Sequence, residues 1–304
     1  GCPYNCSYCC ESYYNVLYGR KFFRRRSVDS VLHELTTMKK RYNFKEVMFN
    51  DSIFFTNLPW VKTLLEKYRT RIGVPFRCFG RVNAFSEEVA ELLKRAGCYA
   101  IEFGIQTLNE PLRKNILNRP ENNQDSRNAF ALCDTYGISY DIDHMFGLPE
   151  EQEEDHAYAA QVYGNLKHLN RIKCHNLMYF PKLAITSLAE KKGILSSSDV
   201  QLIDAGEKGV DFFHVDSVKE AEWQRINRSY QTLYKMLPLL TPRLLKFLLA
   251  RNVQRKLHRV PHPVVVFLQV LVAIRGKDYR FILYIRYYGR RIKRWFKLRW
   301  KLGT

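Results

Sequence analysis

Acidic residues are almost absent from the last part of this sequence. Residues 241–304 contain 17 Lys or Arg but one acid, Asp278, whereas residues 1–240 carry 32 basic and 29 acidic side chains. The formal charge of +19 therefore divides into +16 at the C-terminal end and +3 elsewhere. A polyanion is attracted only where charge is concentrated, so a membrane surface or RNA is expected to contact residues 241–304 and not the nearly neutral body.

The sequence also has no secretory signal peptide and no long apolar run. Its twelve-residue stretch 263–274 is nearly uncharged, but a helix of that length is too short for a bilayer core of about 30 Å. A reducing, cytoplasmic compartment is therefore expected, with cysteines that are not paired in disulfides. The chain begins with Gly1 instead of Met, and its chemistry begins at Cys2, so we expect further sequence upstream.

Strand and helix patterns alternate along the first 180 residues. Apolar periodicity and cap residues predict helices at 27–42, 57–71 and 87–96, and strands at 45–50, 74–82, 98–106, 138–146 and 171–180. Alternation at this short spacing predicts the α/β class, with a parallel sheet and crossover helices.

The segment 98–106 indicates the two faces of that sheet. Ile101, Phe103 and Ile105 point to one side, whereas Glu102 and Gln106 point to the other. A polar side suits a barrel lumen, and a flat doubly wound sheet is the alternative on pattern alone. We predict a partial (β/α)6 TIM-like barrel at 1–190 with its first strand upstream, a connector and helical cap at 191–240, and a basic, mainly helical extension at 241–304.

Cysteines at positions 2, 6 and 9 form a C-x-x-x-C-x-x-C loop. Three thiolates on one short loop can bind three irons of a four-iron cluster and leave the fourth iron open. Zinc prefers four closed ligands, usually in two separated pairs, and no matching second pair is present. Cys10 is expected to be a bystander, and the remaining cysteines are expected to be reduced, buried, small apolar residues: Cys78, Cys98, Cys133 and Cys174.

This loop resembles the signature of radical S-adenosylmethionine (radical SAM) enzymes, whose open iron binds the methionyl amine and carboxylate of SAM. Further segments resemble the coproporphyrinogen-oxidase-like and cobalamin-associated subgroups at matching intervals: Gly104-Ile105-Gln106-Thr107, Leu117-Asn118-Arg119 and Asp143-His144-Met145-Phe146-Gly147-Leu148-Pro149. The resemblance covers residues 1–188 and leaves out the basic tail.

The resemblance implies a set of site residues. A 4Fe-4S cluster would be held by Cys2, Cys6 and Cys9. SAM would be contacted by Tyr8, Asn50, Asp51, Ser52, Arg81, Gln106, Arg119 and Asp143. Many members have a Gly-Gly-Glu run for the methionyl amine where this chain has 50–52, so its backbone carbonyls and Asp51 are the expected substitutes.

The implied chemistry is transfer of one electron, from a flavodoxin- or ferredoxin-type donor, to SAM. Methionine and a 5′-deoxyadenosyl radical would form, and the radical would act on a small-molecule or lipid substrate. Glu102, His144 and His175 are the candidate catalytic residues, although each histidine could instead be structural. Similar relatives often carry an upstream cobalamin-binding domain, so cobalamin-dependent methyl transfer is one expected outcome.

The basic tail has competing interpretations. Its segment 284–301 interleaves Tyr, Trp, Phe and Leu with Arg and Lys, which fits the interface of an anionic membrane or an RNA backbone with stacked bases. The apolar stretches 237–249 and 263–274 favour the membrane, and a solvated helical cap is the third interpretation. A tRNA-modifying radical enzyme and a non-catalytic, metal-stabilised nucleic-acid-binding protein are the alternative functions.

Overall fold

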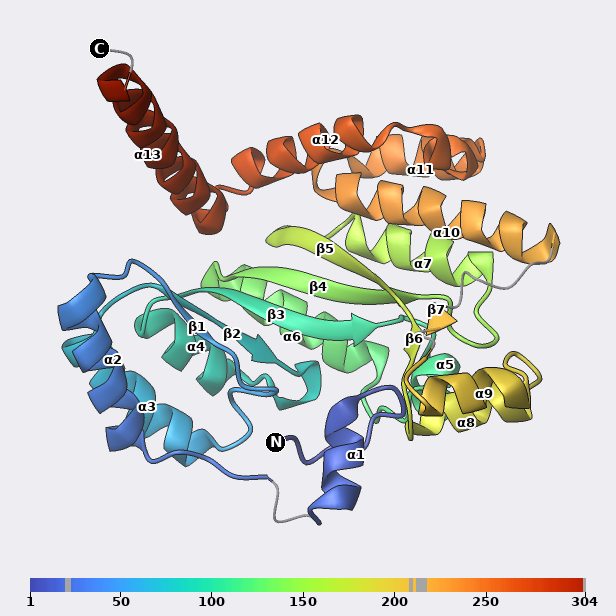
Figure 1. Cartoon of the computed structure of the whole chain (residues 1–304), viewed down its shortest axis with the longest axis horizontal. Helices are drawn as coiled ribbons and strands as arrows, with labels where there is room; N and C mark the ends of the chain where they lie inside the picture. The colour runs from blue at the N-terminus through green and yellow to red at the C-terminus, as the bar shows by residue number, and fades with distance from the viewer. Residues whose placement is uncertain (20–22, 208–209, 212–217, 303–304) are drawn as a thin grey trace.

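The computed structural model describes residues 1–19, 23–207, 210–211 and 218–302 (Figure 1), with the backbone alone at 210–211, 218–220 and 294–302. Its centre is a parallel sheet in the order β1-β2-β3-β4-β5. The strands are β1 (Val47–Phe49), β2 (Phe76–Gly80), β3 (Cys98–Gln106), β4 (Ser139–Phe146) and β5 (Leu169–Asn176). The predicted α/β class is confirmed. Among the described residues, β1 and β5 do not pair with each other, so the sheet is open and not a closed barrel.

Amphipathic helices connect the strands and cover one face of the sheet. Side-chain caps begin two of these helices: the Ser27 and Ser86 side chains accept hydrogen bonds from the backbone N–H of Ser30 and Val89. The helices are α2 (Val28–Tyr42), α3 (Leu58–Arg71), α4 (Glu87–Arg95), α6 (Asn123–Tyr136) and α7 (Glu153–Tyr163). Because each crossover returns the chain to the same end of the sheet, all five strands point the same way.

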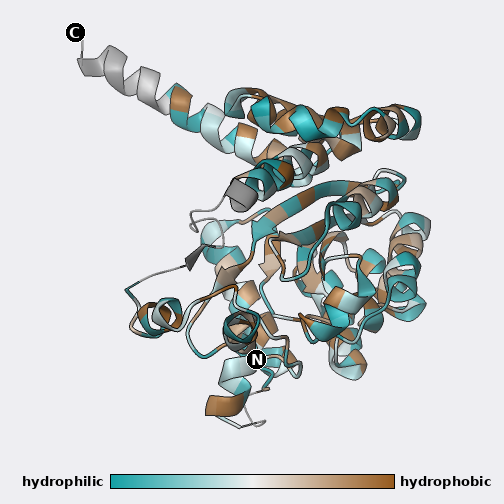
Figure 2. Cartoon of the chain, turned by 90° about the vertical axis from the view of Figure 1, so that its right-hand side faces the viewer, coloured by the Kyte–Doolittle hydropathy of each residue, from teal (hydrophilic) through white to brown (hydrophobic). Residues whose placement is uncertain are grey.

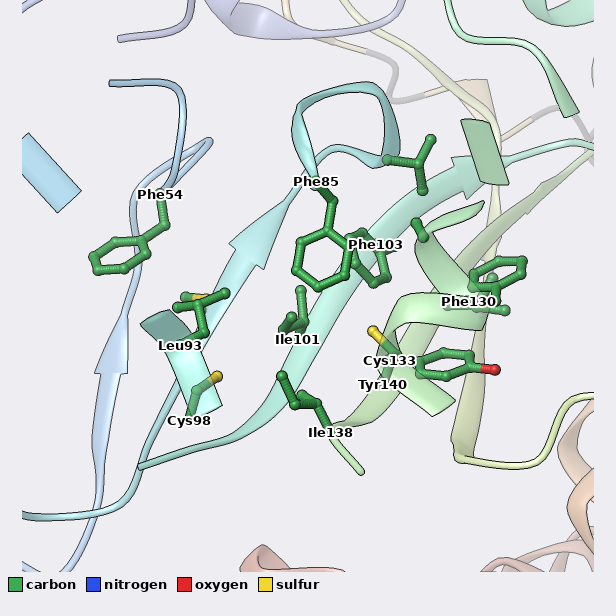
Figure 3. Packing of buried hydrophobic residues seen from close by; sticks show 14 of the residues in the cluster. Phe54, Phe85, Leu93, Cys98, Ile101, Phe103, Phe130, Cys133, Ile138 and Tyr140 are labelled. Atoms are coloured by element: carbon green, nitrogen blue, oxygen red, sulfur yellow. The ribbon is translucent and has the colours of Figure 1, made fainter. Parts of the chain in front are cut away.

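The main core lies between this helix layer and the sheet. Ile101 and Phe103 of β3 point into it, and the rings of Phe130 and Tyr140 stack at 5.1 Å between centroids (Figure 3). Cys133 is fully buried in the same core, with Cys78 and Cys98. The three cysteines therefore behave as small apolar residues, as predicted.

The other face of the sheet, which we call the polar face, carries charged side chains. Glu102 of β3 pairs with Lys173 of β5 at 2.5 Å and with Arg77 of β2 at 3.6 Å. Asp141 and Asp143 of β4 lie on the same face, Asp141 in register with Glu102 and Asp143 in register with Gly104. The alternation predicted for residues 98–106 is thus confirmed.

A smaller group of elements lies beyond the carboxyl ends of the strands. The predicted strand 171–180 is wrong in extent, because β5 ends at Asn176 and a separate pair, β6 and β7, is antiparallel. Within the predicted connector and helical cap at 191–240, residues 197–204 form a helix capped by the side chain of Ser196. These elements are α1 (Cys10–Leu17), α5 (Glu110–Asn115), β6 (Met178–Tyr179), α8 (Ala184–Lys191), α9 (Ser197–Asp204) and β7 (Val210–Asp211), and a 3-10 turn, η2 (Val82–Ala84), follows β2.

The C-terminal third is helical. Tyr230, Leu233 and Tyr234 join the main core, whereas the last helix projects away from the body (Figures 1 and 2). Its beginning is nevertheless anchored, because Arg280 is buried and donates to Asp141 of β4. The elements are α10 (Val218–Met236), η4 (Leu237–Leu239), α11 (Pro242–Ala250), η5 (Val253–Arg259), α12 (His262–Arg275) and α13 (Tyr279–Leu302).

Within the described part of the chain, no single helix is both long enough and apolar enough to cross a membrane. The pair η5 and α12 meets the criteria together, but the two segments are bent by 114°.

Candidate cluster and cofactor site

The cysteine loop lies at the carboxyl ends of the strands. Ser7 fixes it: its backbone N–H donates to Leu117 O at 3.0 Å, its hydroxyl donates to Ile116 O at 2.6 Å, and its carbonyl accepts from the N–H of Ile185 at 3.0 Å. The side-chain amide of Asn118 donates to the carbonyl of Asn5 at 2.7 Å. Parallel α/β sheets bind ligands at this end.

The three predicted cluster ligands come together in this loop. Cys2 and Cys6 are buried and Cys9 is partly buried, whereas Cys10 is exposed. Burial raises the pKa of Cys9 to about 11, and nearby Cys10, Cys6 and Cys2 add to the effect. Burial likewise raises the pKa of Cys2, with Cys6 as one contributor. The thiols are therefore close enough for their charges to interact.

The three sulfurs are not drawn together around one point, as the ligands of a single bound ion would be. Among the described residues, the cysteines form no group whose ligand atoms all lie within 4.8 Å of one another. One zinc ion holds its ligands close together, whereas a four-iron cluster binds each cysteine at a different corner. Three free thiols on one loop, two of them buried and one partly buried, are a donor set that suits the cluster the sequence predicts.

Arg81, which follows β2, contacts the loop directly. Its Nη1 lies 3.6 Å from the sulfur of Cys6, and its guanidinium carbon lies 3.6 Å from the centre of the Tyr4 ring. Its Nε donates to Glu121 at 2.6 Å. A buried guanidinium beside a cysteine sulfur can compensate the negative charge that a ligating thiolate carries.

Arg119 links the loop to strand β3. Its guanidinium donates to the hydroxyl of Tyr8 at 2.9 Å, to the carbonyl of Gly104 at 2.5 Å and to Glu121 at 2.9 Å. Burial raises the pKa of Tyr8 to about 12. Burial works against ionisation of Glu121, but the charges of Arg119 and Arg81 outweigh it and lower the pKa of this carboxyl.

The sequence interpretation missed Glu121. This carboxylate is the common partner of Arg81 and Arg119 and is itself buried. The available signal was an acid two residues after Arg119, since two buried arginines near one site require a shared counter-charge.

Gly104 makes room for the predicted Gln106. A β-carbon at Gly104 would lie 2.7 Å from Nε2 of Gln106 and 3.8 Å from Nη1 of Arg119. The register shifts between Gly104 and Gln106, and Gln106 has φ +67°, so the strand ends in a bulge there. The amide of Gln106 and the guanidinium of Arg119 therefore both lie next to Gly104.

The segment Asn50-Asp51-Ser52 follows β1 and is exposed. The hydroxyl of Ser52 donates to Glu11 of α1 at 2.7 Å. Helix α1 begins directly after Cys9. The segment predicted to receive the methionyl amine therefore borders the cysteine loop.

Asp143, His175 and Glu102 share the polar face of the sheet. Nε2 of His175 lies 3.3 Å from Asp143, and this hydrogen bond raises the pKa of His175. Burial, and then the charge of Asp143, raises the pKa of Glu102. The sequence interpretation missed Lys173, which neutralises Glu102; alternation along β5 is the signal that could have found it.

His144 is not part of this arrangement. It adjoins Asp143 in the sequence, but its side chain points into the helix layer, where Nδ1 lies 3.1 Å from the Tyr163 hydroxyl. Burial lowers its pKa well below the ordinary value. Successive strand residues face opposite sides, so the predicted catalytic role of His144 is corrected.

The family model of the Radical SAM superfamily matches residues 1–162, which is more than half of the chain. This chain belongs to the radical SAM superfamily. Membership implies a 4Fe-4S cluster and SAM as cofactors. The matched residues include the cysteine loop, the first four strands and the network of Arg81, Arg119 and Glu121.

Methyltransferases are among the sequence relatives of this radical SAM chain. An uncharacterized methyltransferase of Pyrococcus horikoshii is 28% identical over 156 residues, or 51% of this chain and 33% of the relative. The bacteriochlorophyllide d C-12(1)-methyltransferase of Chlorobaculum tepidum is 28% identical over 158 residues, again 51% and 33%. The chain thus spans about a third of the length of these curated relatives.

Solved structures share the fold. The radical SAM methyltransferase TsrM of Kitasatospora setae, solved with cobalamin and a [4Fe-4S] cluster, matches 63% of this chain and 38% of its own, at a TM-score of 0.54 and 20% identity. The cobalamin-dependent SAM radical enzyme OxsB matches 96% of this chain and 49% of its own, at a TM-score of 0.55 and 16% identity. The second likeness extends past residue 188 and includes most of 241–304, where the predicted resemblance had ended.

Proposed function

We propose that this chain holds a 4Fe-4S cluster through Cys2, Cys6 and Cys9 and cleaves SAM reductively. The observation that carries the proposal is the position of the cysteine loop. It lies at the carboxyl ends of a parallel sheet, with Arg81 beside Cys6 and Arg119 beside Tyr8. A metal-stabilised nucleic-acid-binding protein has no need of buried, charge-compensated thiols that border a polar sheet face.

When bound and reduced by a flavodoxin- or ferredoxin-type donor, the cluster supplies the electron that divides SAM into methionine and a 5′-deoxyadenosyl radical. Arg81 stabilises negative charge at Cys6, and Glu121 fixes its guanidinium. The carboxylate and ribose of SAM contact hydrogen-bond donors supplied by Arg119, Gln106 and Tyr8. Asn50-Asp51-Ser52 receives the methionyl amine through its carbonyls and Asp51.

The polar face is the proposed substrate side of the chamber. Asp143 lies there with Glu102 and His175, and Lys173 balances the charge of Glu102. Exposed His175 is the candidate for proton transfer or substrate contact. The mixture of charge and hydrogen-bonding groups suits a small organic substrate with polar substituents.

Substitutions of Cys6 and Cys10 test the cluster proposal. The full chain is reconstituted anaerobically with iron and sulfide, reduced, and assayed for 5′-deoxyadenosine. Cys6→Ser is expected to lose at least about 100-fold in SAM cleavage, whereas Cys10→Ser, an exposed thiol four residues away, keeps the parent rate. Equal loss in both variants, or bound zinc without cleavage in the parent, contradicts the proposal.

We further propose methyl transfer through cobalamin as the reaction outcome. The curated relatives above are methyltransferases, and TsrM and OxsB are cobalamin-bound. The reconstituted chain is incubated with free cobalamin and SAM labelled in its methyl group. Label on cobalamin or on an added acceptor supports methyl transfer, and 5′-deoxyadenosine as the sole product contradicts it.

For residues 241–304 we propose a separate basic segment that binds an anionic membrane surface, which would place the protein at the inner face of a membrane. On α13, exposed Tyr284, Tyr288 and Ile292 stand beside exposed Arg290 and Arg291, and the helix projects from the body (Figure 2). Apolar and cationic side chains on one exposed helix are typical of interfacial helices. The side chains of 294–302, including Trp295, Phe296 and Trp300, lie outside the described residues.

Vesicle flotation tests the membrane proposal. The full chain is expected to float with vesicles that contain phosphatidylserine and not with pure phosphatidylcholine, and Arg290→Glu with Arg291→Glu reduces binding about tenfold or more. Lys62→Glu with Lys67→Glu, on helix α3, is the matched control. Failure to float, or tighter binding to tRNA than to vesicles, contradicts it. A lipid substrate becomes the next candidate only if flotation succeeds.

A further inference from the structure

Three buried, metal-ligating residues lie together on the side of β4 opposite the polar face. They are His144 in the strand, Glu151 in the loop that follows it, and His156 in α7. One ligand atom of each lies within 4.8 Å of the others. We call this set the His–Glu–His cluster. It is separate from the cysteine loop, because it lies in the helix layer behind β4, whereas the loop lies at the carboxyl ends of the strands.

Each member has one atom with a partner and one without. His144 Nδ1 lies 3.1 Å from the Tyr163 hydroxyl, and His156 Nε2 lies 3.1 Å from Oδ1 of Asn227. Oε2 of Glu151 accepts from the backbone N–H of Gly147 at 2.7 Å. His144 Nε2, His156 Nδ1 and Glu151 Oε1 are buried with no hydrogen-bond partner.

This pattern is the one that metal ligands show. A ligating imidazole is normally oriented by a hydrogen bond from its second nitrogen, and a ligating carboxylate is held in the same way. A buried polar atom left without a partner costs about 1–3 kcal/mol. Each of the three residues has one such atom, in a group whose ligand atoms lie within 4.8 Å of one another, and this favours an occupant that accepts electron pairs.

The surroundings exclude bulk water. Aromatic rings enclose the cluster, and His144 lies 4.9 Å from the Tyr234 ring while His156 stacks on Phe146 at 4.7 Å between centroids. His144 and His156 expose 1% and 0% of their surface, and Nε2 of His156 also lies 3.5 Å from Oε2 of Glu151. The described residues of α10 supply the back of the site through Asn227 and Tyr230.

We propose that His144, Glu151 and His156 bind one divalent transition-metal ion, zinc being the first candidate, at a structural site in the helix layer. Two imidazoles and one carboxylate suit Zn²⁺ and Fe²⁺ far better than Mg²⁺ or Ca²⁺. Zn–N distances of about 2.0–2.1 Å place tetrahedral ligands about 3.4 Å apart, so the side chains must close by little more than about 1 Å. The ion ties β4 to α7 directly and to α10 through Asn227.

Cobalt binding tests the site without interference from the iron cluster. The full chain carries Cys2→Ser, Cys6→Ser and Cys9→Ser, so the cysteine loop supplies no thiolate. This background is expected to bind one equivalent of Co²⁺ with a visible absorption band, and added Zn²⁺ displaces it. Zinc also raises the thermal midpoint of the same protein by several degrees.

Glu151→Gln is the informative variant. Glutamine keeps an oxygen that accepts from Gly147 but removes the charged ligand, and it is expected to weaken Co²⁺ binding at least about tenfold. His168→Ala, which removes a partly exposed histidine paired with Asp134, is the control and keeps the affinity. The inference is overturned if the background binds no Co²⁺, or if both variants bind it equally. Neither result bears on SAM cleavage by the protein with its cysteines intact.

Discussion

The two faces of strand β4 place neighbouring residues in opposite environments. Ile142 and His144 point into the helix layer, where both are essentially inaccessible to solvent. Asp141 and Asp143 point to the polar face, where each has charged partners. One strand thus serves a stabilising core on one side and the proposed reaction chamber on the other.

The difference teaches that position within the pleat, more than residue type, assigns a role here. His144 and His175 are both histidines in adjacent strands, but only His175 lies beside Asp143. An enzyme of this type needs a rigid layer behind its chamber, since cofactor residues must be held to within a fraction of an ångström.

The largest expected effect comes from the core side of β4. Ile142→Ala should lower the free energy of unfolding by about 2–5 kcal/mol, because a fully buried aliphatic side chain leaves a cavity. Asp143→Ala, at the next position, should lower the free energy of unfolding by less than about 1 kcal/mol, since Asp143 is partly exposed. Urea unfolding of both variants measures the contrast, and equal losses would remove the distinction between the faces.

The next effect comes from Asp141, which anchors the C-terminal segment to the sheet. Asp141→Asn should lower the free energy of unfolding by about 2–3 kcal/mol, because buried Arg280 then keeps Asp278 as its one counter-charge among the described residues. Residues near 275–280 should also become more accessible to proteolysis. Asp204→Asn breaks an exposed pair with Lys182 and is the control.

The same carboxylate gives a pH dependence. Burial opposes ionisation of Asp141, but Arg280 and Arg171 outweigh it and lower its pKa. Its stabilising contribution is therefore present above its unfolded pKa and is lost as pH falls through the lower folded pKa. The difference in stability between parent and Asp141→Asn should shrink below about pH 4; a difference independent of pH would contradict this account.

A smaller effect concerns cofactor affinity at the end of β3. Gly104→Ala places a methyl group 2.7 Å from Nε2 of Gln106, so the amide must move and SAM binding should weaken about tenfold. Gly289→Ala, in α13 with open space around it, should leave affinity unchanged. Equilibrium binding of SAM to the reconstituted variants is the measurement, and unchanged affinity in Gly104→Ala would exclude Gln106 from the site.

The smallest effect is the titration of His175. Its hydrogen bond with Asp143 raises the pKa of the imidazole, so this small contribution to stability is present below the unfolded pKa and lost as pH rises through the folded value. In Asp143→Asn, NMR titration should show a lower pKa for His175. Since His175 is exposed, the accompanying change in unfolding free energy should be close to zero.

The sequence by itself determined the parallel α/β class, the extent of β3 and the grouping of Cys2, Cys6 and Cys9. These features are local: cap residues, two-residue alternation and ligand spacing act within one turn or one strand. The sequence also predicted that Cys10 is not a cluster ligand, because it is adjacent to Cys9. The structure places Cys10 at the exposed start of α1.

Tertiary structure alone decided which distant groups meet. Glu121 becomes the shared partner of Arg81 and Arg119 because the segment after β2 meets the segment between α5 and α6. Arg280 reaches Asp141 across 139 positions of the chain. The pleat of β4 turned His144 away from the chamber toward His156. Such contacts depend on how elements pack, and packing is a property of the whole core that no short segment carries.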